Sequence, residues 1–94
     1  MNIEFVRSVS SPDHTPGQTL QTLWSVEGSF YVASSRRMHT SNMMYLDETM
    51  VFPSDSTGNI TDYRDLAVIE PSVWKVDEHK DLIEKAVNNE NSIE

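Results

Sequence analysis

The chain contains 94 residues, with 15 acidic side chains, seven lysines and arginines, and a formal net charge of −8 at pH 7. A chain of this length supports one modest core, so we treat residues 1–94 as a single small domain. Cysteine is absent, which excludes disulfides, thiolate metal sites and cysteine nucleophiles. No apolar run approaches the ~18 residues of a membrane span, and the first residues lack a secretory pattern. We therefore expect a cytoplasmic protein that does not bind membranes.

The charge is divided unevenly along the chain. Residues 1–46 carry three acids and three arginines, whereas residues 47–94 carry twelve acids and four basic side chains. The backbone of a nucleic acid attracts a basic surface, so we expect no direct binding to nucleic acid. An acidic half-chain favours a basic protein partner, although negative charge also serves simply to keep a small protein soluble.

The first third of the chain predicts two strands separated by an exposed loop. Residues 2–9 largely alternate apolar and polar side chains, as in a half-buried strand near the edge of a sheet. Residues 10–18 contain two prolines and a glycine but no apolar side chain, which indicates an exposed loop. Residues 18–26 fit a helical face or a strand face, and their threonine and valine content favours a strand.

A tight hairpin is expected next. Glu27-Gly28 is a turn dipeptide, and the β-rich run Phe30–Ala33 supplies the returning strand. Residues 34–45 are more polar and include two adjacent arginines, so we expect a long connection there.

Residues 45–70 are expected to form the middle of the sheet. Two apolar runs, Met50–Phe52 and Leu66–Ile69, flank a cluster of turn residues, as a β-hairpin requires. Pro53 should end the first strand because proline cannot donate to a strand ladder. Around Thr61–Asp65 we expect a short turn in which a side chain bonds nearby backbone amides.

The C-terminal segment predicts a helix with Asp77 as its N-cap and a frayed tail over residues 90–94. Its apolar residues recur with helical spacing, so one stripe can pack on the sheet: Leu82, Ile83, Ala86 and Val87. Together the elements predict an α+β fold, with a small antiparallel sheet of four or five strands and one C-terminal helix packed on one face. The alternative is a partly open barrel.

The central hairpin contains a recognisable run of sequence. Residues 48–55 read Glu-Thr-Met-Val-Phe-Pro-Ser-Asp, and residues 58–63 read Gly-Asn-Ile-Thr-Asp-Tyr. This arrangement resembles small proteins of tailed bacteriophages and prophages, in which a similar strand precedes an acidic, glycine-containing turn and a threonine and aromatic pair. The similarity covers about a third of the chain and includes no catalytic residue. It implies a phage-encoded protein made in the cytoplasm of a bacterial host.

No catalytic, metal or cofactor motif stands out in the sequence. The histidines lie far apart in polar stretches without metal-ligand spacing, and we expect all three on the surface: His14, His39 and His79. Residues 55–62 superficially resemble a calcium loop, but no glycine stands at its sixth position, and Leu66 stands at the twelfth position, where the loop needs a glutamate. We therefore expect a β-turn with Gly58 or Asn59 at positive φ. We therefore predict no enzymatic activity, no metal and no cofactor.

Two groups of residues are candidates for a partner-binding surface. Six acids should gather around the central hairpin, with further acids on the helix: Asp47, Glu48, Asp55, Asp62, Asp65 and Glu70. An apolar patch suited to an adaptable interface follows the two arginines: Met43, Met44 and Tyr45. Solvation of the turns and of the helix face is the simpler explanation of the acids, and burial in the core would account for the methionines and the tyrosine.

These features favour a non-enzymatic, acidic protein that binds a host protein with a basic surface, such as a nucleic-acid-binding protein, and modulates or inhibits it. One alternative is a self-assembling structural module, for example a homodimer formed through an unpaired strand edge. Another alternative is sequestration of a small signalling molecule, with an aromatic ring stacked on a base: Trp24, Tyr31 or Tyr63.

Overall fold

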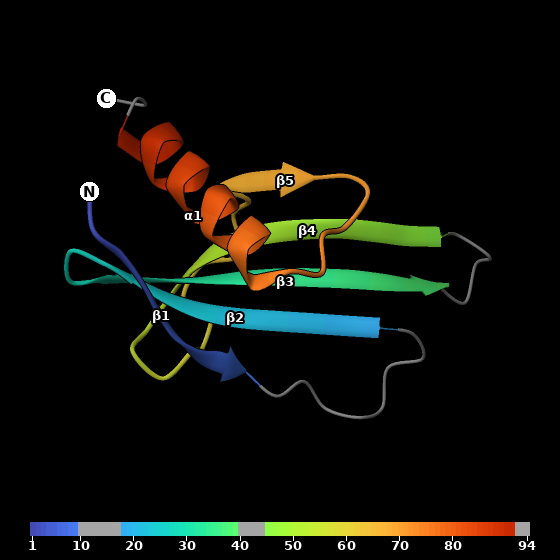
Figure 1. Cartoon of the computed structure of the whole chain (residues 1–94), viewed down its shortest axis with the longest axis horizontal. Helices are drawn as coiled ribbons and strands as arrows, with labels where there is room; N and C mark the ends of the chain where they lie inside the picture. Colours follow the sequence, from blue (N-terminus) through green and yellow to red (C-terminus); the bar gives the residue numbers. More distant parts are fainter. Residues whose placement is uncertain (10–17, 40–44, 92–94) are drawn as a thin grey trace.

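The computed structural model describes residues 1–9, 18–39 and 45–91. Their backbone forms a five-stranded antiparallel sheet with the strands in chain order, and one helix packs across one face (Figure 1). The predicted α+β fold is therefore confirmed. The elements are β1 (Ile3–Val9), β2 (Gln18–Val26), β3 (Ser29–His39), β4 (Tyr45–Ser54), β5 (Ala67–Ile69) and α1 (Val76–Asn91).

The β2–β3 hairpin follows the sequence pattern closely. All of residues 18–26 pair with β3, so the strand alternative for this segment is confirmed. Glu27 (φ 50°) and Gly28 (φ 89°) form the two-residue turn, and positive φ at both positions matches the twist of the flanking strands. Gln18 belongs to β2 and not to the predicted loop, whose residues 10–17 lie outside the described part of the chain.

The prediction of a long connection over residues 34–45 is wrong. β3 continues to residue 39 and β4 begins at residue 45, while residues 40–44 are not described. The ladder extends because side chains paired across it interact. Three contacts support the extension: Arg36 with Glu48 (3.5 Å), Arg37 with Asp47 (3.4 Å), and the ring of His39 with that of Tyr45 (5.0 Å between centroids).

β4 also continues past Pro53, where we expected it to end. Pro53 lies opposite Tyr31 of β3, and its carbonyl oxygen accepts a hydrogen bond from the backbone N–H of Thr61 (3.0 Å). Because the nitrogen and the carbonyl of one strand residue point the same way, the proline nitrogen also faces away from β3. Its missing N–H therefore costs no bond in the β3–β4 ladder.

The segment between β4 and β5 covers the sheet face opposite α1. It is the yellow segment that turns below the sheet, beside β1, in Figure 1. Arg7 of β1 donates to the carbonyl of Thr57 in this segment, and the ring of Tyr63 lies 5.8 Å from that of Phe52. These contacts explain why three side chains on a face without a helix are at most 7% exposed: Leu23, Val32 and Phe52.

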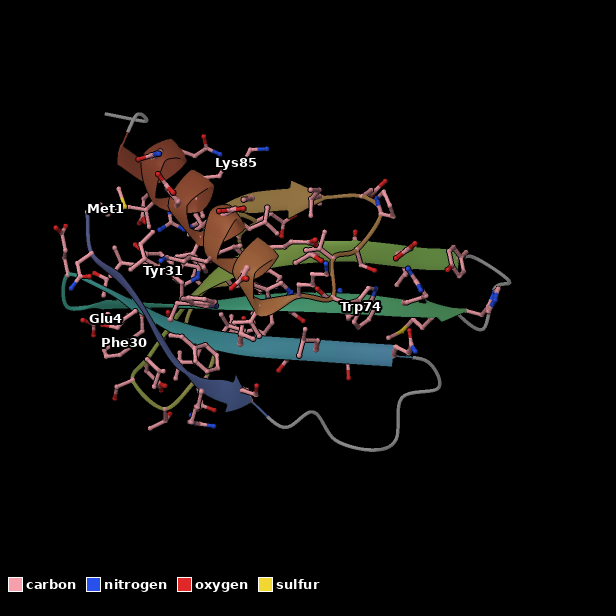
Figure 2. The ribbon with its side chains drawn as sticks, viewed as in Figure 1. Met1, Glu4, Phe30, Tyr31, Trp74 and Lys85 are labelled. Carbon is pink, nitrogen blue, oxygen red and sulfur yellow. The ribbon has the colours of Figure 1, made fainter. Side chains whose placement is uncertain are left out.

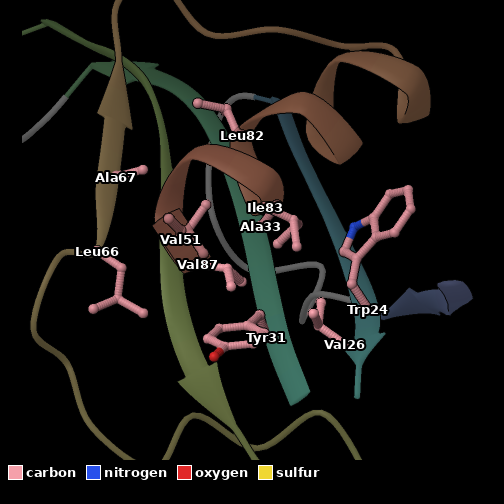
Figure 3. Close-up of a cluster of buried hydrophobic side chains, with 11 residues drawn as sticks. Trp24, Val26, Tyr31, Ala33, Val51, Leu66, Ala67, Leu82, Ile83 and Val87 are labelled. Atoms are coloured by element: carbon pink, nitrogen blue, oxygen red, sulfur yellow. The ribbon is translucent and has the colours of Figure 1, made fainter. Parts of the chain in front are cut away.

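The main core lies between α1 and the other face of the sheet (Figure 3). The predicted stripe of α1 packs there as expected, with each of its four apolar side chains at most 7% exposed. The sheet and the segment before β5 supply the opposing side chains: Trp24, Val26, Tyr31, Ala33, Val51, Leu66 and Ala67. Alternation along the strands separates this set from the residues of the second face.

α1 begins before the predicted N-cap. The carbonyl oxygen of Lys75 accepts hydrogen bonds from the backbone N–H groups of Glu78 (3.1 Å) and His79 (3.2 Å). Asp77 therefore sits inside the first turn, where its negative charge still favours the positive end of the helix dipole.

The C-terminal end of α1 also differs from the prediction. Residues 90 and 91 are helical, so fraying from residue 90 is wrong, and residues 92–94 are not described. Glu90 is held because it accepts hydrogen bonds from the Tyr31 hydroxyl (2.8 Å) and the Arg64 guanidinium (3.3 Å). Burial and the bond to Glu90 raise the pKa of Tyr31 to about 12. The same carboxylate thus ties the helix to β3 and to the β4–β5 segment.

Replacing Gly58 by alanine should destabilise the fold more than replacing Gly28. Both glycines have positive φ, 97° and 89°, so both variants carry a similar backbone strain. A Cβ at Gly58 would also lie 3.2 Å from Cγ2 of Val9, whereas a Cβ at Gly28 meets nothing within 4 Å. We expect losses in the free energy of unfolding of about 2 kcal/mol for G58A and about 1 kcal/mol for G28A, measured by urea denaturation. Equal losses would contradict the close packing of this segment on β1.

Candidate functional site

The hairpin acids of β4 are already paired within the fold. Asp47 accepts hydrogen bonds from the Ser72 hydroxyl, the Ser72 backbone N–H (3.0 Å) and the Arg37 guanidinium (3.4 Å). The Ser72 hydroxyl, together with the other donors, lowers the pKa of the Asp47 carboxyl. Glu48 pairs with Arg36 across the ladder. These two carboxylates therefore hold β4 to its neighbours and are not free to meet a partner.

Asp55 and Asp62 serve turns. Asp55 Oδ1 accepts from the Thr57 hydroxyl (2.6 Å) and from the backbone N–H groups of Thr57 (2.9 Å) and Asn59 (3.0 Å), which together lower its pKa. Asp62 accepts from the backbone N–H of Arg64 (3.1 Å) and pairs with its guanidinium. Both predicted turns are confirmed, and no cluster of three potential metal ligands occurs among the described residues.

Apart from Glu27 in the β2–β3 turn, the unpaired acids of the described residues lie around β5 and along α1. Within residues 1–9, 18–39 and 45–91, no side-chain hydrogen bond or ion pair engages six carboxylates: Asp65, Glu70, Asp77, Glu78, Asp81 and Glu84. Two of them, Asp65 and Glu70, belong to the predicted hairpin set, and the other four lie on the helix. The unpaired acidic surface is therefore displaced from the hairpin turn toward the edge of the sheet and the outside of α1.

A groove of about 370 Å³ runs between β5 and α1 on this side of the molecule. Its helical residues are spaced i, i+3, i+4 and i+7, so they form one stripe of α1 that faces β5. Ile69, Val73 and Leu82 supply its apolar surface, and the charged side chains on its rim are Glu78, Asp81 and Lys85. Figure 2 labels Lys85 on this side of the helix. We call this feature the β5–α1 groove.

The predicted apolar patch is only partly described. Met43 and Met44 lie outside the described residues, whereas Tyr45 is 54% exposed at the start of β4. The neighbouring cation is partly occupied within the fold, because the Arg37 guanidinium lies 5.5 Å from the ring centroid of Trp74 and its side chain remains 41% exposed. Figure 2 labels Trp74 beside the long strands of the sheet. The described part of this patch is therefore an exposed tyrosine beside a packed arginine.

Two of the three aromatic rings proposed to stack on a small ligand are in the core. Trp24 is 2% exposed and Tyr31 is 7% exposed, so neither ring offers a free face to a base. Tyr63 is 75% exposed, with its ring tilted against Phe52 on one side. The described rings thus do not form an aromatic binding pocket.

The prediction that all three histidines lie on the surface is wrong for His79. Its side chain is 0% exposed between α1 and the sheet, with Nδ1 2.7 Å from the Thr22 hydroxyl and Nε2 2.7 Å from the Ser35 hydroxyl. His39 is exposed as expected, and His14 is not described. Sequence reasoning missed His79 because its immediate neighbours are charged. The signal was its spacing, since residue 79 falls three and four positions before the apolar pair at 82 and 83.

Hydroxyl groups on the Nε2 side of His79 form a closed set of bonds. The carbonyl of Val73 can only accept, so the Ser35 hydroxyl donates to it (2.6 Å). Ser35 then accepts from the Thr49 hydroxyl (2.6 Å) and from Nε2–H of His79, while Thr49 accepts from the Val73 backbone N–H (3.0 Å). This arrangement places the imidazole proton on Nε2.

The Nδ1 side completes the same arrangement. With its proton on Nε2, neutral His79 accepts at Nδ1 from the Thr22 hydroxyl, and the Thr22 oxygen accepts from Nε1–H of Trp24 (2.7 Å). Every polar atom of the imidazole is thus satisfied without a charge. Burial lowers the pKa of His79, because the imidazolium would lose hydration and Thr22 would lose its acceptor.

The contact between Ser35 and His79 pairs a hydroxyl with a base but cannot act on a substrate in this structure. Both side chains are 0% exposed, and the Ser35 hydrogen is directed at a backbone carbonyl. A catalytic nucleophile needs an accessible oxygen whose proton passes to the base. We therefore interpret this network as part of the core.

Comparison with protein-family models, with curated protein sequences and with solved structures finds no match to this chain. No helix within the described residues is long and apolar enough to cross a membrane. The β5–α1 groove and the unpaired acids beside it are therefore the candidate site on the basis of geometry.

The stability of the fold should fall as the pH drops through the ordinary histidine range. The pKa of His79 in the folded chain lies below the usual 6.5, so the unfolded chain binds the proton more readily. The folded state consequently loses stability from about pH 6.5 downward, until the folded-state imidazole itself is protonated. We expect the free energy of unfolding, from urea denaturation, to be lower at about pH 5.5 than at about pH 7.5.

Two variants assign this effect to one imidazole. In the His79→Gln variant, the free energy of unfolding should differ much less between the two pH values than in wild type, whatever the stability of the variant at neutral pH. His39→Gln, at an exposed position, should keep the wild-type change. An undiminished change in H79Q would contradict a buried neutral imidazole, and NMR titration of the ring protons gives an independent check.

Proposed function

We propose that this chain is a non-enzymatic binding protein, encoded by a tailed bacteriophage, that attaches to a host protein with a basic surface and modulates or inhibits it. One observation carries the proposal. The acids of β4 and of the Asp55 and Asp62 turns are paired or hydrogen-bonded inside the fold, and so is Glu90 of α1. Among the described residues, the other acids of α1 and the two that flank β5 in the sequence make no such bond. Unpaired carboxylates gathered on one side create a field that draws and orients a basic partner.

The acids would act mainly on the rate of encounter. A single exposed ion pair contributes only about 0–1 kcal/mol, so charge alone gives little affinity. Lasting attachment needs buried apolar contacts at the centre of the interface. The β5–α1 groove offers such contacts beside the unpaired acids, and Ile69, which is 37% exposed, presents its apolar side chain there.

The resemblance to phage proteins supports the provenance and not the mechanism. Its residues form β4 and the segment that covers the second face of the sheet, and they have roles in strand pairing, turns and packing. A bacterial protein, encountered in the cytoplasm of an infected cell, is the corresponding class of partner.

A second candidate, self-assembly, is favoured by the outer edge of β1. Phe5 is 47% exposed and Val6 is 44% exposed on an edge strand in the half of the chain that has no net charge. The ladder shift between Phe5 and Arg7 weighs against it, because a β-bulge disrupts regular pairing with another strand. A dimer in size-exclusion light scattering at micromolar concentration, without any captured host protein, would favour this alternative.

Reversing acids beside β5 should slow association with the host protein. The tagged chain is first used to capture proteins from bacterial lysate at about 50 mM and about 500 mM salt, since screening weakens steering. The captured basic protein is then immobilised, and association rates are measured for wild type and for a Glu70→Lys, Asp81→Lys double variant. We expect the double variant to associate about tenfold more slowly at low salt and to depend less on salt.

A matched control carries the same change of charge elsewhere. Glu4→Lys with Glu27→Lys also raises the net charge by four, but in the half of the chain that has no net charge, and should slow association much less. Equal slowing by both double variants would mean that net charge matters and the position of the acids does not. Absence of any basic protein retained at low salt would contradict the proposed function itself.

A further inference from the structure

The two edge strands of the sheet are not alike. β1 carries a β-bulge and the charged side chains Glu4 and Arg7, which are features that discourage pairing with another strand. β5 consists of Ala67, Val68 and Ile69, pairs with β4 without a register shift, and has no described strand on its outer side. The backbone edge of β5 is therefore open to an added strand.

The β5–α1 groove lies on one side of this edge. Ile69 pairs with Thr49 on the face that carries α1, and its side chain contributes to the groove together with Leu82. Val68 pairs with Met50 on the opposite face and does not line the groove. A strand added beside β5 would direct alternate side chains toward the groove, because successive residues of a strand point to opposite faces.

The charged side chains around the groove indicate which kind of segment can bind there. Glu78 and Asp81 lie on the rim, Glu70 directly follows Ile69, and Lys85 is the one basic side chain among the lining residues. An extended segment with lysine or arginine two positions from an apolar residue would place its cations on the groove side, near these acids. A second copy of this chain would instead bring like charges together along the same edge.

We propose that the β5 edge and the β5–α1 groove bind an extended segment of a partner protein by strand addition. The segment forms backbone hydrogen bonds along the outer side of β5, places one apolar side chain in the groove and flanks it with basic side chains. The inference rests on the proposed function, since it names the surface and the chemistry by which the basic host protein is held.

Selection from a display library of random linear peptides tests the chemistry directly. The full chain is immobilised at about 50 mM salt, where electrostatic attraction is little screened. We expect enriched peptides to carry a large apolar residue with lysine or arginine two positions before or after it. A failure to enrich peptides, or enrichment of a pattern without basic residues, would overturn the proposal.

The most enriched peptide is then synthesised and its affinity measured by fluorescence anisotropy. Ile69→Lys should weaken binding by at least about tenfold. Val68→Lys introduces the same charged side chain at a position of similar exposure on the opposite face, and its affinity for the peptide should stay within about threefold of the wild-type affinity. Methylation of the peptide's backbone nitrogens should abolish binding if backbone pairing holds the segment, whereas undiminished binding would contradict strand addition.

Two further results separate the docking mode from the function. In the first, the captured host protein binds the I69K variant as well as it binds wild type, but the reversal of Glu70 and Asp81 still slows association. Strand addition at β5 would then be wrong, and the proposed function would stand. If wild type forms a dimer in light scattering and I69K does not, the groove accommodates a second copy and the proposal is overturned.

Discussion

The hydrogen bonds of the buried His79 imidazole fix where α1 lies on the sheet. Apolar contacts between the helix and the strands stabilise the fold without favouring one exact position, because the hydrophobic effect is non-directional. The imidazole is different, since its two nitrogens must meet Thr22 of β2 and Ser35 of β3. A buried polar group left unpaired costs about 1–3 kcal/mol, so sliding or rotating the helix by one residue is disfavoured.

This constraint also shapes the candidate site. With His79 directed at the sheet, the neighbouring stripe of α1 faces β5, and this stripe supplies Glu78, Asp81 and Lys85 to the groove. Val73, whose carbonyl oxygen and backbone N–H both belong to the network, contributes to the same groove. The groove is therefore held by rigid core contacts, and a partner segment would meet a preformed surface.

Patterns local in sequence were sufficient to predict the sheet, the helix and its apolar stripe, because alternation and helical spacing are set by near neighbours. The extension of β3 and β4 depends on pairs such as Arg36 with Glu48, which are invisible until the strands are aligned. The pairing of Asp47 with Ser72 has the same cause, since 25 positions separate these residues. For this reason composition predicted an acidic surface correctly in outline but could not show which acids remain unpaired.

The negative charge of the acids beside β5 has two consequences, repulsion of a like-charged edge and attraction of an oppositely charged segment. Negative charge along an apolar edge strand protects a monomer, because two identical edges repel each other when they approach. The same charge attracts a segment of opposite sign, so an edge closed to self-association stays open to a basic strand. Specificity is a difference between two affinities, here the affinity for a basic partner and the affinity for a second copy of the chain. Repulsion between like charges lowers the affinity for the second copy, which increases this difference just as new contacts with the partner would. A surface that serves only solubility needs no apolar groove beside its acids, and here Ile69, Val73 and Leu82 provide one.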